Sequence, residues 1–413
     1  MRADARLLLV PLLAAAALAC SGCSRAHDGI RIGVLADCRG LFAGLQDLML
    51  GGAELPLIER GARLRGPKPS NGITRAKVRG REVELVSGCS ELGEFTVLVQ
   101  ETRRLVEHDH VDVIVGTVGG GDGIVLRELA RRYPNVAFVI AGTATREVTS
   151  VRAPRNLFRF QPDDAQSAAG LGTYAYRRLG WRRAALVADD DPNGWGLAAA
   201  FAAEFCAQGG EVVDRQLLSG LEPSAPHYPT GVDGATVMLS TYPQAADYIR
   251  AVARRLGPGR LILGPRITQD PFLRGAVGPA LIGAVTSSPL PLPFSNPAVR
   301  RFELAYRRAF PTAPPDFASG LITREYYDGV DAVLRAIDAA PHGSLVSALG
   351  RVTLDVPGGR ISLDARRQAV VPVALLRVTK GAAFKTINVL RGVDQTLRGA
   401  LPEPEIGPAS VGC

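Results

Sequence analysis

Short apolar runs with β-strand character alternate with amphipathic helical segments along most of this chain. In the segment 92–107, for example, apolar residues recur at the three- and four-residue spacing of a helix that buries one face. Repeated strand–helix–strand order is typical of parallel sheets that are covered by helices on both faces. Because the runs are too many for one ordinary sheet, we predict an α/β fold with two doubly wound parallel-sheet lobes. The strand-like runs lie at 30–36, 82–87, 111–116, 136–140, 156–160, 183–188, 211–217, 234–240, 261–264 and 282–286, and further β segments follow within 350–395.

The composition of the chain is that of a folded protein with more than one domain. Its 413 residues suit two or three domains, and a hydrophobic content of 46% is enough to fill their cores. The formal net charge is +8, but the arginines that carry most of it are spread along the sequence. A nucleic-acid interface usually shows a clustered basic stripe with interleaved aromatic residues. We therefore interpret the charge as a solvated basic surface and predict no nucleic-acid partner.

The first 23 residues have the organisation of an export signal. Arg2 and Arg6 precede an apolar run at 7–19 that is too short for a membrane span, and small residues then lead to Cys20 and Cys23. A cysteine at this place indicates a bacterial lipoprotein, lipid-anchored to the membrane through Cys20 or Cys23. The alternative is ordinary signal cleavage to a soluble exported protein. In both cases we predict an extracytoplasmic location, in the periplasm or at the outer face of the cell membrane.

Export permits disulfides, and two cysteines are placed to form one. Cys38 follows the first predicted strand and Cys89 follows the second. In a flavodoxin-like 2-1-3-4-5 sheet these strands are neighbours whose carboxyl ends share one edge, so we predict a Cys38–Cys89 disulfide. No CxxC or HxxxH spacing accompanies the cysteines, and no metal site is expected. Cys206 lies on an apolar helical segment and is expected to be a buried thiol.

The stretch "VDVIVGTVGGGDGIVLREL", residues 111–129, joins an apolar strand to a helix through a glycine-rich loop, and Asp122 is interpreted as the N-cap of that helix. Its GxGxG pattern is not the GxGxxG dinucleotide fingerprint, and it lies in the third strand–helix unit instead of the first. The loop still offers free backbone N–H groups at a helix N-terminus, which suit a carboxylate or another small polar group. GxSxG, Walker A, HExxH and paired CxxC motifs do not occur in the sequence, so we expect neither an enzyme nor a cofactor.

Several stretches together resemble a known family. They are "IRIGVLADCRG", "VDVIVGTVGGG", "PNVAFVIAGTAT" and the segment 156–205, which begins "NLFRFQPDDAQSAAGLGTYAY". They are similar to the type I periplasmic solute-binding proteins of ABC transporters, in the branched-chain amino acid (Leu/Ile/Val-binding) branch, and the similarity covers nearly all of 30–395. The resemblance implies a non-enzymatic receptor, expected as a monomer, whose two lobes are joined by a three-crossover hinge. Such lobes close on a small ligand and deliver it to a membrane permease.

The resemblance also implies how the chain is divided. A signal peptide with a lipoprotein-type cysteine is followed by an N-terminal lobe, a C-terminal lobe and a loose tail. These are 1–23 for the signal peptide, 30–161 plus 287–364 for the N-terminal lobe, 162–286 plus 365–395 for the C-terminal lobe, and 396–413 for the tail.

The resemblance places the ligand site on loops between the lobes. Serine positions in the family's loop after the third strand fall at Gly120 and Gly121, beside Gly119, so only backbone donors remain here. The family's threonine in the next loop corresponds to Thr145, with Thr143 close by. The ligand-binding residues that the resemblance implies are Gly119, Gly120, Gly121, Thr143, Thr145, Asp164, Asn193, Tyr242 and Arg266.

The last four residues of this set determine which kind of ligand the resemblance predicts. The family's ammonium-binding aspartate corresponds to Asp164, a ligand-stacking tyrosine falls at Asn193, and a second aromatic residue is retained as Tyr242. A second ammonium-binding carboxylate of the family becomes Arg266, which reverses the local charge. We therefore expect an organic acid, an amide or another polar solute in preference to leucine, isoleucine or valine. Several of these residues also have a structural alternative. Thr145 would stabilise a turn, Asp164 would cap a helix and Tyr242 would pack in the core. Arg266 would face solvent or form an ion pair with Asp270.

The predicted function is therefore an extracytoplasmic receptor that captures a small polar ligand, namely an amino acid, an amide or an organic acid, for an ABC transporter permease. The alternative is a sensory ligand-binding protein of the same fold that acts on a separate signalling partner. An exported enzyme ranks last, because it would require a nucleophile or metal constellation that the sequence does not show.

Overall fold

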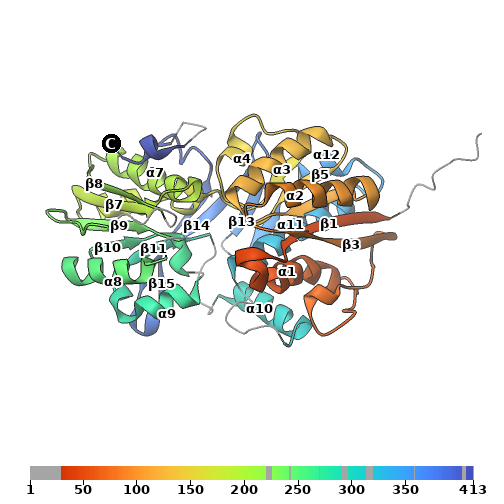
Figure 1. The fold of residues 1–413 in the computed structure, drawn as a ribbon, viewed down its shortest axis with the longest axis horizontal. Helices are drawn as coiled ribbons and strands as arrows, with labels where there is room; N and C mark the ends of the chain where they lie inside the picture. Colours follow the sequence, from red (N-terminus) through yellow and green to blue (C-terminus); the bar gives the residue numbers. More distant parts are fainter. Residues whose placement is uncertain are drawn as a thin grey trace, which may run out of the picture.

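The computed structural model describes residues 29–219, 226–240, 243–268, 270–289, 296–312, 320–357, 359–401 and 406–412. In this part of the chain the strands form two separate sheets, one in each of two lobes that lie side by side (Figure 1). Helices cover the sheets in both lobes. The predicted two-lobe α/β fold is confirmed.

The first lobe contains the sheet β2-β3-β1-β4-β5-β6, in which β2 is antiparallel to β3 and the remaining neighbours are parallel. Without the β2 edge, its order is the expected 2-1-3-4-5. Alternate residues of β4 face opposite sides: Val113 and Val115 pack with α1 and α11, whereas Ile114 packs with α2 and α3. The strands are β1 Ile30–Asp37, β2 Ala76–Val78, β3 Arg81–Ser90, β4 Val113–Gly116, β5 Ala137–Ile140 and β6 Leu157–Arg159.

The helix α1 of the first lobe packs closely against α11. A side chain at Gly52 would collide with the carbonyl oxygen of Thr323, so glycine is required for this approach. By length and composition Gly40–Ile58 could cross a membrane, but 56% of its most apolar window is buried inside the protein, as in a core helix. The helices of this lobe are α1 Gln46–Ile58, α2 Phe95–Arg103, α3 Gly120–Arg132, α4 Glu147–Ser150, α10 Pro297–Ala309, α11 Leu321–Ala339 and α12 Leu345–Leu349.

The second lobe repeats the same strand order and then departs from it. The strands β8-β7-β9-β10-β11 are parallel in the order 2-1-3-4-5, but β14 is antiparallel to β11, and β15 is antiparallel to β14. The strands are β7 Arg183–Asp189, β8 Glu211–Leu218, β9 Gly234–Met238, β10 Leu261–Leu263, β11 Val285–Ser288, β12 Leu354–Val356, β13 Gly359–Leu363, β14 Ala369–Val378 and β15 Phe384–Val393. The helices are α5 Asp164–Ser167, α6 Leu171–Arg177, α7 Pro192–Ala207, α8 Ala245–Leu256 and α9 Pro271–Val277.

The described chain passes between the lobes after β6, after β11 and between α12 and β12. The first two passages lie close to the expected boundaries at residues 161 and 286, although β11 continues to Ser288 in the second sheet. The hairpin β12–β13 was expected in the first lobe. It instead hydrogen-bonds to β14 through the pairs Ser362↔Val370 and Leu363↔Ala369, so it extends the second sheet toward the first lobe.

A fully buried polar network fills the hinge between the lobes. The guanidinium of Arg159 donates to Gln368 Oε1 at 2.5 Å, to the Thr145 carbonyl at 2.7 Å and to Thr149 Oγ1 at 2.8 Å. Gln395 Nε2 donates to the carboxylate of Asp163 at 2.8 Å. Buried polar groups persist where they are hydrogen-bonded to one another, so this network fixes the relative positions of the hinge segments.

The tail at 396–413 was expected to be loose, but its described residues are packed. Leu401 and Val411 are buried in the core, because apolar side chains recur between the polar and glycine positions of this segment. The Leu401 carbonyl accepts a hydrogen bond from Arg146 of the first lobe at 3.2 Å, and the Val411 carbonyl accepts one from Arg215 of β8 at 3.0 Å. The tail therefore contacts both lobes.

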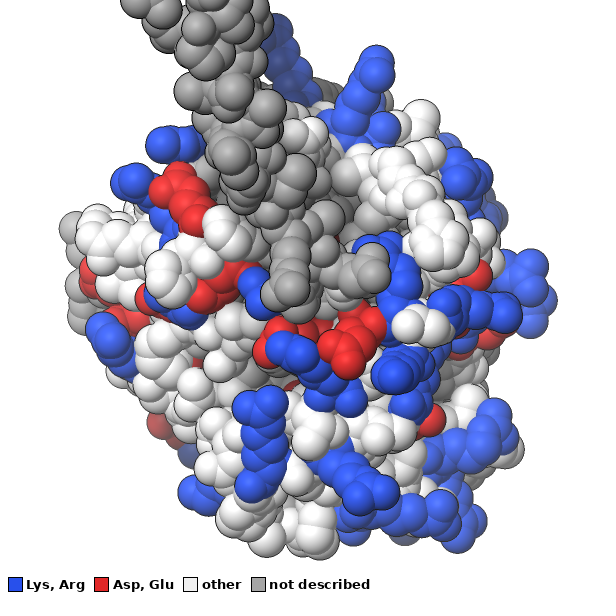
Figure 2. Space-filling model, turned by 90° about the vertical axis from the view of Figure 1, so that its right-hand side faces the viewer, with Lys and Arg blue, Asp and Glu red and all other residues white. Residues whose placement is uncertain are grey.

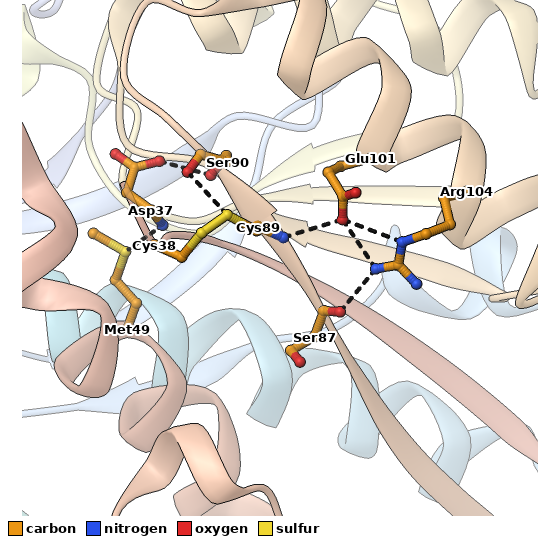
Figure 3. The surroundings of a disulfide bond; sticks show 8 residues. All are labelled: Asp37, Cys38, Met49, Ser87, Cys89, Ser90, Glu101 and Arg104. Atoms are coloured by element: carbon orange, nitrogen blue, oxygen red, sulfur yellow. Dashed lines mark hydrogen bonds and ion pairs between the residues drawn. A yellow bond between two sulfur atoms is a disulfide. The ribbon is translucent and has the colours of Figure 1, made fainter. Parts of the chain in front are cut away.

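The structure contains the disulfide between Cys38 and Cys89 that the sequence predicts, with Cα atoms 5.3 Å apart (Figure 3). It joins the carboxyl ends of the neighbouring parallel strands β1 and β3. The backbone N–H of Cys89 donates to Glu101 of α2 at 3.2 Å, which ties this edge of the sheet to a covering helix. The expectation for Cys206 was wrong: it lies half-buried near the end of α7 and is disulfide-bonded.

Lysine and arginine side chains are spread over the outer end of the first lobe and mixed with acidic and uncharged ones, as Figure 2 shows. Arg75, for example, forms ion pairs with Glu82 at 3.1 Å and with Glu84 at 3.2 Å. This mixed distribution agrees with the interpretation of the positive charge as a solvated surface.

Candidate functional site

Three of the predicted ligand-binding residues, from the two lobes, meet at the carboxyl ends of the parallel strands. Thr145 lies after β5 in the first lobe and Asn193 lies in the first turn of α7 in the second, and their Oγ1 and Oδ1 atoms are 3.0 Å apart. A Cβ atom at Gly120 would collide with Thr145 Oγ1 and would lie 3.2 Å from Asn193 Oδ1. The backbone of α3 can therefore approach this point only because residue 120 is glycine.

The glycine-rich loop ends at Gly119, which is the N-cap of α3 and is buried. No side chain caps this helix, and among the described residues no acceptor binds the backbone N–H groups of Gly120 and Gly121. Such free donors at the positive end of a helix dipole attract an anion or the negative end of a polar group. The predicted donor loop is therefore present and exposed at Gly121.

The interpretation of Asp122 as the N-cap was wrong, because this residue lies at the third helical position of α3. Its carboxylate accepts the backbone N–H of Gly93 at 3.3 Å, and so it links the glycine loop to the segment before α2. Burial, with a smaller contribution from the charge of Asp37, raises the pKa of Asp122 to about 6. Asp122 therefore holds the glycine-rich loop in place through its hydrogen bond with Gly93.

Thr143 supports the glycine-rich loop through its hydroxyl group. Its side chain is fully buried, and its hydroxyl lies 3.0 Å from the Thr117 carbonyl and 2.9 Å from the Gly119 carbonyl. A hydroxyl donates one proton, so it serves these two acceptors in alternation and holds the loop in place. The structure thus gives Thr143 a positioning role, whereas the resemblance had grouped it with the ligand contacts.

Asp164 is the first residue of α5, and the N-cap is its neighbour Asp163, whose side chain accepts the Gln166 N–H at 2.7 Å. The capping alternative for Asp164 is therefore excluded. Its side chain is buried against α7, because a Cβ atom at Gly196 would lie 2.9 Å from Asp164 Cβ. Burial, and then the charges of Asp163 and Asp191, raise the pKa of Asp164 well above its usual value. Its Oδ2 atom has no hydrogen-bond partner among the described residues.

Arg266 is half-buried in the 3-10 helix Pro265–Thr268, and its side chain makes no hydrogen bond or ion pair with the described part of the chain. Its alternative partner, Asp270, instead caps α9 by accepting the N–H groups of Phe272 and Leu273, both at 2.9 Å.

Glu325 of α11 is a second buried acid of this region, and the sequence analysis missed it. Burial, and then the charges of Asp328 and Asp164, raise the pKa of Glu325 well above its usual value, whereas Arg266 lowers it. The three groups Asp164, Arg266 and Glu325 thus share one electrostatic environment. A signal was present: Glu325 occupies the apolar stripe of the helical segment 320–339, between Ile322 and Gly329.

Phe95, at the start of α2, is a further residue that the sequence analysis did not single out. Its side chain is 47% exposed, and a Cβ atom at Gly121 would lie 2.8 Å from Phe95 Cζ. An aromatic ring therefore borders the free donors of the glycine loop. Tyr242, the predicted aromatic residue of the second lobe, lies outside the described residues, as do Cys20 and Cys23.

Comparisons with known proteins agree with this architecture. The model of the family described as periplasmic binding protein matches residues 29–383. A Leu/Ile/Val-binding protein homolog from Brucella melitensis is 26% identical over 182 residues, which are 44% of this chain and 45% of that relative. The aligned part of this chain therefore spans less than half the length of that relative.

Two solved structures share the fold over nearly their whole length. An ABC transporter substrate-binding protein from Sphaerobacter thermophilus has a TM-score of 0.72 at 22% identity, and the match covers 89% of this chain and 99% of that one. A solute-binding protein of an ABC transporter from Rhodopseudomonas palustris, in complex with p-hydroxybenzoic acid, has a TM-score of 0.74 at 19% identity and covers 89% and 98%. None of these three proteins is named as an enzyme.

Proposed function

The chain belongs to the periplasmic binding protein family, and from this membership we propose that it is an extracytoplasmic receptor for a small polar solute. The solute binds between the two lobes, and the loaded protein delivers it to the membrane permease of an ABC transporter. The protein works as a monomer, and its contribution is capture and closure, without chemical conversion of the solute.

The observation that carries this proposal is the meeting of Gly120, Thr145 and Asn193 at the boundary between the lobes. Free backbone donors from the first lobe and a side chain from the second lobe lie at the same point. A ligand that binds both lobes favours their closed arrangement by as much as its extra contacts there are worth. The arrangement of these three residues therefore supports capture of a solute by closure of the two lobes.

Within this function we infer that the preferred solute is an organic acid, with amides as weaker ligands. The N–H groups of Gly120 and Gly121 and the guanidinium of Arg266 are all donors. The raised pKa values of Asp164 and Glu325 make these carboxyls less anionic, so the positive charge of Arg266 counts for more. The relative from Rhodopseudomonas palustris in complex with p-hydroxybenzoic acid agrees with an acidic ligand. A free α-ammonium group would instead meet a cation.

The test is titration calorimetry of the purified mature protein with a panel of aromatic acids, aliphatic acids, amides and amino acids. We expect p-hydroxybenzoate or a related acid to bind the wild type, and we expect Arg266→Glu to weaken this binding while Asp164→Ala changes the preference among ligands. Thermal unfolding is the supporting measurement, since a ligand that binds the folded state raises its stability. Tight binding of leucine by the wild type, unchanged in both variants, would contradict the ligand class and the site.

We further propose that an acylated Cys20 or Cys23 anchors the protein to a membrane. A diacylglycerol and a third chain hold a protein at a bilayer more firmly than one acyl chain does. Intact-mass analysis of the natively exported protein tests this anchor. An unmodified N-terminus at Ser24 or beyond would exclude it, and the binding function would be unaffected.

A further inference from the structure

A cavity lies in the second lobe, separate from the residues that meet at the lobe boundary. Its volume is about 380 Å³, and it lies between α6, the end of α7, the strands β14 and β15, and the start of the tail. This volume is within the range of small-molecule sites in proteins. None of the predicted ligand-binding residues lines it.

The backbone around this cavity adopts conformations that most residues avoid. Gly170, before α6, has a φ of 85°, and a Cβ atom there would lie 2.5 Å from Leu390 Cδ1. In the tail, Leu397 and Arg398 have φ values of 50° and 59°, in the left-handed region that disfavours non-glycine residues. The carboxylate of Asp394 holds this turn by accepting the N–H of Arg398 at 3.3 Å. Strain of this kind persists where the surrounding structure fixes a particular side-chain arrangement.

The floor of the cavity is apolar and its inner polar group is already satisfied. Leu375, Val393 and Leu397 line it and are buried. Glu204 also lines it, but its carboxylate accepts the backbone N–H groups of Gly170 at 2.8 Å and Thr173 at 3.3 Å. The Glu204 carboxyl is therefore directed to the N-terminus of α6, and burial raises its pKa, which the backbone hydrogen bonds only partly offset.

The mouth of the cavity is cationic. Arg177, Arg178 and Arg398 line it and are exposed, and none of them forms an ion pair with a carboxylate in the described ranges. Arg177 donates to the Gln208 side chain at 2.6 Å, and Arg398 donates to the Arg391 carbonyl at 2.9 Å, so both guanidinium groups retain free donors. Three cations above an apolar floor, of which only Arg398 interacts with the charge of Glu204, are complementary to a molecule with a negative head and an apolar body.

We propose that this cavity binds a small monocarboxylate, with its apolar chain on the leucine floor and its carboxylate at the arginines of the mouth. The site is distinct from the one at the lobe boundary, and it does not depend on the transport function proposed above. The tail supplies one wall of the cavity and also contacts Arg146 of the first lobe, so occupation of the cavity would fix the position of the tail.

The experiment titrates octanoate into the mature protein by calorimetry, with butyrate as the short-chain comparison. The variant Ala207→Trp fills the cavity from an exposed lining position, and Arg398→Ala removes one cation. The matched controls are Ala383→Trp, an exposed alanine outside the lining, and Arg254→Ala, an exposed arginine of α8. Thermal unfolding verifies that each variant is folded.

We expect octanoate to bind the wild type more tightly than butyrate does. Ala207→Trp should weaken octanoate binding about tenfold or more, and Arg398→Ala about three- to tenfold, while both controls leave it unchanged. Gly120→Val, which obstructs the site at the lobe boundary, should also leave it unchanged. The proposal is overturned if octanoate does not bind, or if Ala207→Trp and Arg398→Ala bind it as the wild type does. Loss in Gly120→Val alone would place octanoate between the lobes.

Discussion

Two loops of this protein occupy equivalent places in their lobes and are built in opposite ways. Each follows a parallel strand and leads into a helix: 117–119 joins β4 to α3, and 190–191 joins β7 to α7. The first leaves the N-terminus of its helix without a side-chain cap. In the second, the carboxylate of Asp191 accepts the Gly194 N–H at 2.8 Å, and Asp190 accepts the indole N–H of Trp195 at 2.9 Å. One helix end is free for an external anion, and the other is compensated by its own side chains.

This difference assigns different tasks to the two lobes. A free helix N-terminus attracts negative charge, so the anionic end of a solute belongs at the first lobe. The second lobe, whose acidic loop 190–191 is internally satisfied, contributes the side chains of Asn193 and Arg266. The comparison therefore predicts that substitutions in the glycine loop change ligand affinity, whereas substitutions in the acidic loop change stability.

The largest expected effect comes from Gly120→Val. The added side chain collides with Thr145 Oγ1 and covers the free donors, so we expect ligand affinity to fall about 10- to 100-fold, as overpacking of this kind costs about 1–3 kcal/mol. Calorimetry with the solute found for the wild type measures it. Gly275→Ala is the control, because this glycine of α9 has nothing within 4 Å of its missing side chain. Equal affinity in Gly120→Val would place the solute elsewhere.

The next expected effect is a pH dependence of protein stability, and it comes from Asp122 next to the glycine loop. Its pKa is raised to about 6 in the folded protein by burial, so the folded state holds this proton more tightly than the unfolded state does. The resulting stabilisation is present below pH 4, near the ordinary aspartate value, and is lost as the pH rises through about 6. This shift corresponds to a stabilisation of at most about 3 kcal/mol.

Urea unfolding of the wild type and of Asp122→Asn between pH 4 and 7 tests this expectation. The free energy of unfolding of the wild type should fall relative to that of the variant as the pH rises, since asparagine does not titrate. Buried acids that do not interact with Asp122, such as Glu54, are present in both proteins and cancel in the difference. Parallel pH profiles would show that Asp122 is not perturbed.

A substitution in the acidic loop 190–191 should change the stability of the protein. Asp191→Ala removes the N-cap of α7, and caps of this kind contribute about 0.5–2 kcal/mol. We expect a lower free energy of unfolding, with ligand affinity nearly unchanged once the variant is folded. Chemical denaturation and calorimetry on the same sample separate the two quantities. A large loss of affinity at unchanged stability would mean that the acidic loop, too, contacts the solute.

Much of the fold was predictable because it depends on local patterns. Apolar runs bounded by amphipathic helices located the parallel strands of both lobes, and the adjacency of the first two strands predicted Cys38–Cys89. The helix α1 was missed because it contains Gly51, Gly52 and Pro56, which are poor helix formers. Gly52 allows the close packing of α1 on α11 and Gly51 that of α1 on Tyr306 of α10, which only the tertiary structure reveals.

The candidate site was predictable only in part. Gly120, Thr145 and Asn193 were named from the sequence, and the structure brings them together. Glu325 was missed although it lies in the apolar stripe of its helix, because no local pattern shows that the fold brings this helix into the electrostatic environment of Arg266. Spacing predicts which residues lie near a site, but not which way a hydroxyl or a carboxyl turns within it.

The smallest effect tests the point where the two loops meet. The Thr145 hydroxyl donates to Asn193 Oδ1 across the lobe boundary at 3.0 Å, and a hydrogen bond of this kind contributes about 0.5–1.5 kcal/mol. A double-mutant cycle with Thr145→Val and Asn193→Ala, measured on ligand affinity, should therefore give a coupling energy of about 0.5–1 kcal/mol. Thr143→Val is the matched control, because its hydroxyl bonds to loop carbonyls within the first lobe. It should lower the free energy of unfolding and show no coupling to Asn193. Zero coupling for Thr145 would mean that this threonine only stabilises its own turn and does not contribute to ligand binding across the lobe boundary.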